Sequence, residues 1–223
     1  ETCGARLTMN YIVPGGLMQD IHKKKKKRVK DFLALYKSKI HEYDELVTGN
    51  IIFQNRMKGV GYISAEDAIS FGMTGPAARG SGVSCDIRKL YPYDGYENLQ
   101  FDEILETAGD SFARYMVRIR EMQQSIRIIE QLIDNIPEGD FVAKTKAVLK
   151  LPKGEFYTRV ETARGELGVY IVSEGGTTPY RIKFRSPGFS NLSALDHMAR
   201  GEKLGDLVAM MGTLDLVIPD IDR

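Results

Sequence analysis

The hydrophobic pattern of this 223-residue chain changes period near Gly154, and that change constrains the fold more than any other feature. Before it, apolar residues recur every three or four positions over about 27–48 and again over 101–136, the spacing of amphipathic helices. After it, apolar and polar residues alternate, which is typical of half-buried strands. We therefore predict two long helices, followed by antiparallel strands at 157–161, 167–173 and 180–184.

Turn and capping residues set the expected ends of the long helices. Gly49 and Asn50 end the first, and the second starts near Gly109-Asp110 and ends before Pro137. The segment between the two is glycine-rich, and we expect it to be mostly loop. One short helix is predicted there, because Ser64 begins a capping box.

The fold class that these elements predict is α+β, a long-helix bundle with a small antiparallel β-sheet near the C-terminus. We expect 1–150 to be mainly helical, 151–190 to form the sheet, and 191–223 to form short helices and an inserted tail. Asn191 or Ser193 is predicted to cap a helix through Met198, and 204–211 to form another. Sequence alone leaves open whether the tail is frayed or enters a cavity.

Charge and cysteine content exclude several function classes. The 31 Lys+Arg and 30 Asp+Glu leave a net charge of +1, so the chain lacks the global field of a nucleic-acid-binding protein. Two cysteines, Cys3 and Cys85, are too few for a zinc or iron–sulfur site held by this chain alone. The three histidines share no ligand spacing, so no metal site is expected. Cys85 has no partner motif and is predicted to be a buried thiol.

Targeting and nucleotide-binding signals are not found in the sequence. No apolar run approaches the about 20 residues that cross a bilayer, and no signal peptide is evident, so the chain is predicted to be soluble and intracellular. Neither Gly59-Val60-Gly61 nor Gly80-Ser81-Gly82 extends into a nucleotide fingerprint. The start at Glu1, without methionine, suggests processing or a piece of a longer chain.

Two groups of basic residues each admit two interpretations. The lysine run at 23–27 could bind phosphate or anionic lipid, but a solvated opening turn of a helix is the simpler reading. Six arginines stand beside small, proline or acidic residues, where they could be surface residues or packed structural ion pairs; we favour ion pairs. These arginines are Arg6, Arg79, Arg88, Arg164, Arg181 and Arg223.

Several long motifs, in order from Gly4 to Arg223, resemble the 49-kilodalton subunit family of respiratory complex I, known in bacteria as the D subunit of NADH-quinone oxidoreductase. They include GARLTMNYIVPGG, TGPAARGSGVSCDIRK, ARYMVRIREMQQSIRIIEQ, TARGELGVYIVSEGGTTPYRIKFRSPGF and the ending GTLDLVIPDIDR. The family is related to nickel–iron hydrogenase large subunits, whose metal is held by paired cysteines. Here PDIDR replaces the C-terminal pair, which disfavours a hydrogenase. The resemblance corresponds to the C-terminal half of the family's subunit.

The resemblance implies a subunit of NADH:quinone oxidoreductase that shapes the quinone cavity beside the terminal iron–sulfur cluster of a small partner subunit. Asp215 and Val217 match positions that line the cavity, and Arg6, Thr8 and Val13 match the neighbourhood of the cluster. Headgroup-contacting residues belong to the family's N-terminal half, so no catalytic residue is assigned and the isolated piece is expected to be inactive. Other peripheral-arm subunits are implied partners, with the membrane arm contacted indirectly. The implied location is the cytoplasmic face of the bacterial inner membrane, or the matrix side in mitochondria.

Thr8 and Val13 depart from the family pattern, in which a histidine and an arginine commonly stand at these positions. A histidine that gains a proton upon cluster reduction raises the cluster's potential, so its loss favours a low-potential acceptor such as menaquinone. The chain is expected to bind no cofactor of its own.

Two alternatives stay open at this point. The chain could serve a related membrane-bound complex with another electron donor, or it could be a catalytically inactive assembly module. In either case the isolated piece should expose apolar surface and be prone to oligomerisation or poor solubility.

Overall fold

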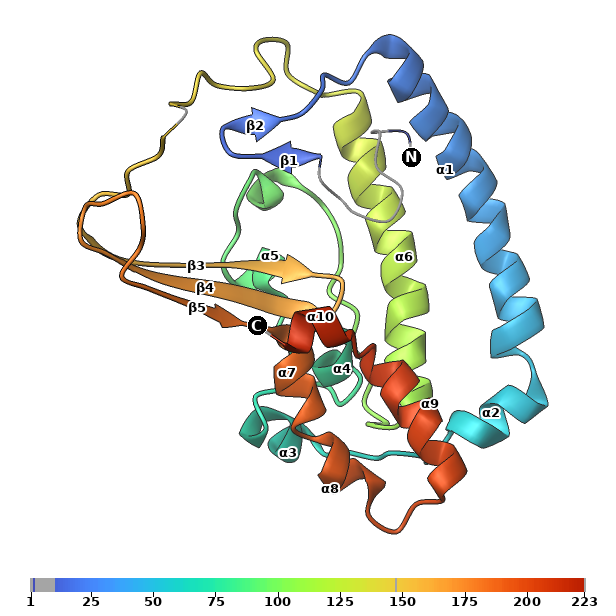
Figure 1. Ribbon diagram of the computed structural model, residues 1–223. Helices are drawn as coiled ribbons and strands as arrows, with labels where there is room; N and C mark the ends of the chain where they lie inside the picture. Colours follow the sequence, from blue (N-terminus) through green and yellow to red (C-terminus); the bar gives the residue numbers. More distant parts are fainter. Residues whose placement is uncertain (1, 3–10, 147, 223) are drawn as a thin grey trace.

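The two longest helices pack against each other along one side of the molecule (Figure 1). In the computed structural model, which describes residues 2, 11–146 and 148–222, helix α1 spans Lys23–Tyr43 and α6 spans Ser111–Ile133. Their contact buries Leu33, Ile40 and Ile126. The prediction of two long helices is confirmed. α1 begins about four residues earlier than predicted, so the lysine run forms its largely exposed first turns, and a π-helical turn, Asp44–Thr48, continues it to the predicted end.

Asp110 fixes the start of α6. One carboxylate oxygen accepts the Ala113 N–H at 2.8 Å and the other accepts the Gly59 N–H at 2.8 Å. The cap thus satisfies a free helix amide and also holds the loop before α3 against α6. The helix therefore starts where the Gly109-Asp110 pair predicts.

The predicted sheet is also confirmed. Strands β3 (Gly154–Thr162), β4 (Gly165–Ser173) and β5 (Arg181–Arg185) form an antiparallel sheet in the order β3-β4-β5. Near the N-terminus a small hairpin, β1 (Ile12–Val13) and β2 (Gly16–Leu17), turns at Pro14 and Gly15. The fold class is α+β, as predicted.

The middle of the chain contains more helix than its glycines suggest. The predicted short helix is α3 (Ala65–Ser70), and Ser64 accepts the Asp67 N–H at 3.0 Å. The prediction missed the other helices, α2 (Ile51–Met57), α4 (Gly75–Arg79), α5 (Ile87–Leu90) and the 3-10 turn η2 (Tyr96–Asn98). Asn50 shows why a helix was missed. The prediction uses Asn50 only as the end of the first long helix, although its side chain also caps the start of α2.

The capping prediction near the C-terminus was wrong. Ser186, not Asn191 or Ser193, caps α7 (Pro187–Leu192), and α8 (Leu195–Ala199) is a separate helix. Asn191 is fully buried inside α7, where its side-chain oxygen accepts the Thr74 N–H at 3.0 Å. A polar residue suited to capping is used here to join distant segments, which local sequence does not reveal.

The last described residues are anchored. Helix α9 (Leu204–Leu214) is followed by α10 (Ile218–Ile221), where Asp220 accepts hydrogen bonds from the Ser186 hydroxyl at 2.7 Å and the Gly188 N–H at 3.1 Å. The tail is therefore not frayed as far as residue 222. Met210 and Leu214 of α9 join the main apolar core, which also includes Ile63 and Met73.

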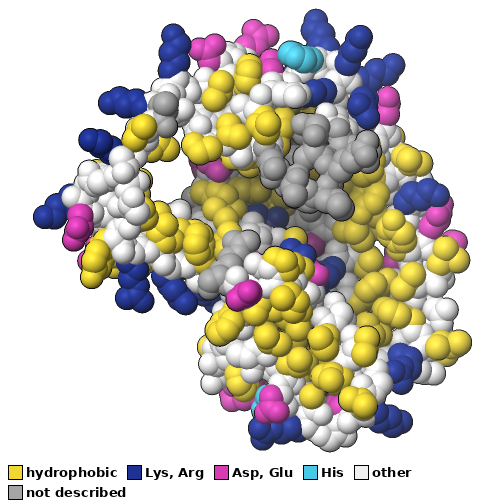
Figure 2. Space-filling view, in the orientation of Figure 1, with side chains coloured by type: hydrophobic (Ala, Val, Ile, Leu, Met, Phe, Trp, Pro, Cys, Tyr) yellow, Lys and Arg dark blue, Asp and Glu magenta, His cyan; other side chains and the backbone are white. Residues whose placement is uncertain are grey.

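Apolar side chains remain exposed along the α1–α2 edge, as Figure 2 shows. Phe32 and Leu35 of α1 and Ile51 and Ile52 of α2 are each more than half exposed. This agrees with the expectation of exposed apolar surface, while self-association stays a prediction. Within the described part of the chain, none of the helices combines the length and apolar character needed to span a bilayer.

Two glycines bring the sheet against α4. Gly75 has φ +66°, and a Cβ there would lie 2.5 Å from the Arg164 carbonyl oxygen. A Cβ on Gly165, with φ +129°, would lie 2.6 Å from Thr74 Cγ2. Both the backbone angle and the close approach therefore require glycine. This contact positions the β3–β4 turn beside the cavity described below.

Gly75→Ala should lower the free energy of unfolding by more than about 3 kcal/mol, because strain at positive φ adds to the steric overlap. Gly72→Ala is the matched control, since Gly72 has the same φ of +66° but open space around it, and should cost about 1–2 kcal/mol. Urea denaturation of the three chains would measure the difference. Equal losses would contradict the role of the close approach.

Candidate functional site

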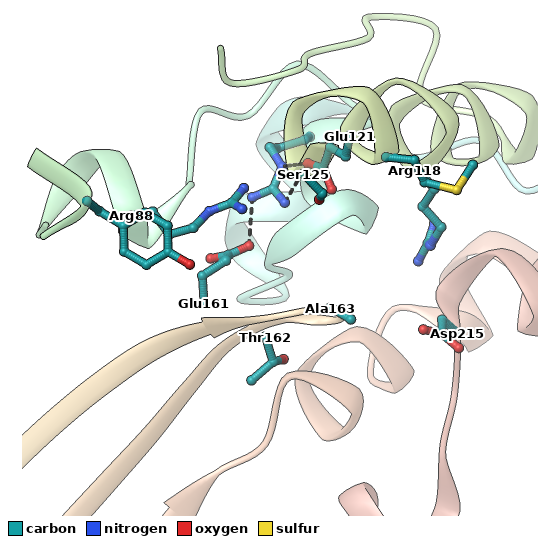
Figure 3. Close-up of a pocket in the computed structure, with 11 residues that line it drawn as sticks. Arg88, Arg118, Glu121, Ser125, Glu161, Thr162, Ala163 and Asp215 are labelled. Atoms are coloured by element: carbon teal, nitrogen blue, oxygen red, sulfur yellow. Dashed lines mark hydrogen bonds and ion pairs between the residues drawn. The ribbon is translucent and has the colours of Figure 1, made fainter. Parts of the chain in front are cut away.

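A cavity of about 370 Å³ lies where α6 faces the end of β3 (Figure 3). Its walls come from α4, α5, η2, α6, the end of β3 with the β3–β4 turn, and the junction between α9 and α10. Figure 2 shows that this face of the molecule is hollowed at its centre, between the β1–β2 hairpin and the sheet. Charged side chains dominate the lining, which consists of Arg79, Arg88, Tyr96, Arg118, Glu121, Met122, Ser125, Glu161, Thr162, Ala163 and Asp215.

One face of α6 carries the polar residues of the upper wall. Arg118, Glu121 and Ser125 all line the cavity. Intervals of three and four residues place side chains on the same face of a helix, so the sequence of α6 by itself forms a polar stripe. One turn earlier, the fully buried Arg114 donates to the carbonyl oxygens of Gly61 at 2.9 Å and Gly109 at 3.1 Å. Burial lowers the pKa of Arg114 to about 10.

Arg79 connects three of the walls. Its side chain is 1% exposed; Nε donates to Glu121 of α6 at 2.7 Å, and Nη1 donates to Glu161 of β3 at 2.9 Å. Burial raises the pKa of both Glu121 and Glu161, and the Arg79 guanidinium opposes but does not cancel that shift. The two carboxylates are therefore costly to ionise unless Arg79 is present.

A second ion pair lies beside the first. Arg88 binds Asp86 in a fork, with Nη2–Oδ2 at 2.7 Å and Nε–Oδ1 at 2.9 Å. Burial alone would raise the pKa of Asp86, but Arg88 holds it below its usual value. Cys85 is partly buried next to this pair, and burial raises its thiol pKa to about 11. The thiol is therefore neutral near pH 7, as expected for a residue that is not a nucleophile.

Asp215 closes the cavity opposite α6. It ends α9 with φ 54°, a left-handed conformation that Asp adopts more readily than most residues. Arg164 Nε lies 3.4 Å from its carboxylate and donates to its backbone carbonyl at 3.2 Å. The side chain of Asp215 is 39% exposed, so its carboxylate faces the cavity and solvent. Val217, two residues on, is partly buried at the start of α10 and is not part of the cavity lining.

Of the three residues expected near the partner's cluster, Val13 belongs to the described part of the chain. Val13 lies in β1, where it pairs with Gly16, and is absent from the described lining. Arg6 and Thr8 lie outside the described residues. Among the residues that are described, no group of three or more His, Cys, Asp or Glu is arranged to hold a metal.

The expected arginine ion pairs are found for Arg79, Arg88 and Arg164. The expectation was wrong for Arg181, whose side chain lies exposed on the edge strand β5. An edge strand leaves a side chain in water, where an ion pair adds little stability. Arg223, like Arg6, lies outside the described part of the chain.

Sequence reasoning missed Arg118, Glu121 and Glu161. A signal was present for the first two, because charged residues at 114, 118 and 121 interrupt the apolar face of a helix predicted to be packed. Glu161 gave no such signal, since its partner Arg79 is 82 residues away.

Arg79→Met should lower the free energy of unfolding by about 3–5 kcal/mol at pH 7, because it leaves two buried carboxylates without their cation. Without Arg79, the folded-state pKa of each glutamate rises further above its unfolded value. The folded chain then binds more protons as the pH falls, so the penalty should shrink between pH 7 and pH 5. The exposed Arg127, which binds Asp102 at 3.0 Å, provides the control Arg127→Met, with an expected loss below about 1 kcal/mol. Urea denaturation at both pH values would test this, and a penalty that grows towards acid would contradict it.

Comparison with known proteins assigns the chain to a family. The family model described as "Respiratory-chain NADH dehydrogenase, 49 Kd subunit" matches residues 1–150 and 141–223. The chain is 52% identical over 223 residues to the C/D subunit of NADH-quinone oxidoreductase from Bacteroides thetaiotaomicron, covering 100% of this chain and 42% of that protein. It is 47% identical over 221 residues to the D 2 subunit of the same enzyme from Solibacter usitatus, covering 99% of this chain and 60% of that protein. The chain thus spans less than two thirds of these relatives, and it belongs to the family of the respiratory-chain NADH dehydrogenase 49-kilodalton subunit.

Proposed function

We propose that the chain is part of a subunit of an NADH-quinone oxidoreductase and contributes a wall of the cavity in which quinone is reduced. The observation that carries the proposal is the position of Asp215, which reaches the cavity from the α9–α10 junction in a chain of this family. The names of the relatives, which are NADH-quinone oxidoreductase subunits, supply the reaction class.

The cavity has properties that suit this role. Its volume of about 370 Å³ falls within the range of small-molecule sites. Ion pairs on Arg79 and Arg88 fix the polar groups of its walls, so a bound ring would meet oriented dipoles instead of mobile water. The chain's task would be to position the quinone and to set the electrostatic field around it, while the electrons arrive from a partner.

The partners follow from the same proposal. The electrons would come from the terminal iron–sulfur cluster of a small neighbouring subunit, with other peripheral-arm subunits completing the assembly. Membrane attachment would be indirect, through the membrane arm, at the cytoplasmic face of the bacterial inner membrane. The family's headgroup-contacting residues would lie in another part of the full-length subunit, so the 223-residue chain alone would not turn over.

Asp215→Asn in the assembled oxidoreductase should raise the KM for a short-chain quinone about tenfold or alter kcat, because it removes the carboxylate charge from the cavity wall. Asn tolerates the left-handed backbone at this position, so the structure should be kept. Asp196→Asn, on the exposed helix α8, is the matched control. Steady-state kinetics with NADH and the quinone measure the effect, and unchanged quinone kinetics in an assembled Asp215→Asn enzyme would count against the proposal.

We further propose that the electron acceptor has a low potential, as menaquinone does. The support is Thr8 and Val13, which stand where many family members have a histidine and an arginine. Without a histidine whose protonation follows reduction, the nearby cluster should have a lower and less pH-dependent potential.

Thr8→His should restore a pH-dependent cluster potential in the assembled enzyme and raise it near neutral pH, because a protonated imidazole stabilises the added electron. A redox titration at several pH values, followed by the signal of the reduced cluster, would measure this. Thr48→His, within the π-helical turn, controls for adding a histidine elsewhere. A parent enzyme that already shows a strong pH dependence would refute the proposal.

A further inference from the structure

Arg118 carries a hydrogen-bond donor that is buried but has no partner. Its Nη1 donates to the Arg114 carbonyl at 3.0 Å. Its Nη2 is shielded from solvent and bonds to nothing among the described residues, and no other buried side-chain nitrogen or oxygen in that part of the chain is left so. Figure 3 shows this side chain extending from α6 into the cavity, towards Asp215.

The unpaired donor is energetically expensive. Burial lowers the pKa of Arg118, yet a guanidinium stays protonated at neutral pH. A buried charged donor without an acceptor loses its hydration and gains nothing in exchange, so native proteins rarely retain one. An acceptor that enters the cavity would remove this cost.

The neighbouring carboxylates do not serve as hydrogen-bond acceptors for Nη2 of Arg118. Glu121 is held by Arg79 at 2.7 Å, and Asp215 lies 3.4 Å from Arg164. Each attracts Arg118 through space without a hydrogen bond. Arg118 and Asp215 both line the cavity, so a ligand seated between α6 and the α9–α10 junction would lie beside Arg118, and a rotation of its guanidinium would bring the shielded Nη2 to the ligand.

The charge of the walls indicates what kind of acceptor fits. Three arginines and three carboxylates line the cavity, so it offers no net positive field for a phosphate or a carboxylate ligand. A neutral carbonyl oxygen accepts a hydrogen bond without repulsion from the acidic side chains. The lining groups are Arg79, Arg88, Arg118, Glu121, Glu161 and Asp215.

We propose that Arg118 contacts the substrate, with its free Nη2 donating a hydrogen bond to a carbonyl oxygen of a quinone ring seated between α6 and Asp215. This inference rests on the proposed function and adds to it a headgroup contact within this chain, beside the contacts that the resemblance places in another part of the full-length subunit. A cationic donor at this oxygen also favours the more electron-rich state of the ring, so the contact strengthens as the quinone is reduced.

Arg118→Met and Arg118→Lys in the full-length, assembled oxidoreductase test the contact. Arg118→Met should weaken equilibrium binding of a short-chain menaquinone about 10- to 100-fold and raise its KM, because a charge-assisted hydrogen bond is lost. Arg118→Lys keeps a charged donor and should recover part of that loss. Arg127→Met, on an exposed face of the same helix, should leave binding unchanged. NADH oxidation with ferricyanide, an acceptor that needs no quinone site, would verify the upstream electron path.

Normal menaquinone affinity in an assembled Arg118→Met enzyme would overturn the inference. Failure of both variants to assemble would also overturn it, since the donor would then serve a contact with another segment or subunit. If Asp215→Asn alters quinone kinetics while Arg118→Met does not, only this inference fails. If both variants assemble and neither affects quinone binding or turnover, the proposed function fails as well.

Discussion

The ion pairs of Arg79 hold the structure together at the point where its helical and sheet parts meet. A single guanidinium, 1% exposed, binds Glu121 of α6 and Glu161 of β3 from the end of α4. Because a buried charge tolerates few alternative arrangements, the pairing fixes the spacing of three elements that are far apart in the sequence.

That constraint also determines the character of the cavity. Since Glu121 is committed to Arg79, and Asp86 to Arg88, most of the charge in the walls is neutralised locally and cannot rearrange around a ligand. Among the charged groups of the lining, the guanidinium of Arg118 keeps a nitrogen without a partner in the described part of the chain, and the carboxylate of Asp215 is 39% exposed. Pre-oriented groups of this kind distinguish ligands by shape and hydrogen bonding more than by total charge.

Sequence reasoning predicted those features that depend on local periodicity. The long helices and the three strands were found because each buries one regular face, Ser64 was recognised as a cap, and the start of α6 was placed near Gly109-Asp110. The short helices α2, α4 and α5 were missed, since their formation depends on caps and tertiary contacts and not on a repeating pattern. The site could be predicted from the sequence only in part. Asp215 was found through the family resemblance, whereas the pairing of Arg79 with Glu161 spans 82 positions and has no local sequence signature.

The contact between Gly75 and Gly165 has a consequence for how the family can vary. When two side chains meet, enlargement of one can be compensated by reduction of the other, and the two positions covary. Here a Cβ on either glycine would meet backbone atoms, which no substitution removes; shortening Thr74 would relieve only its own side-chain contact with Gly165 and would leave Gly75 N at 2.7 Å. A substitution at one of these glycines therefore cannot be compensated by a substitution at the other. In an alignment of the family, each position would then be an invariant glycine. Coevolution methods need variation, so they would not detect this contact, although it is one of the tightest in the molecule.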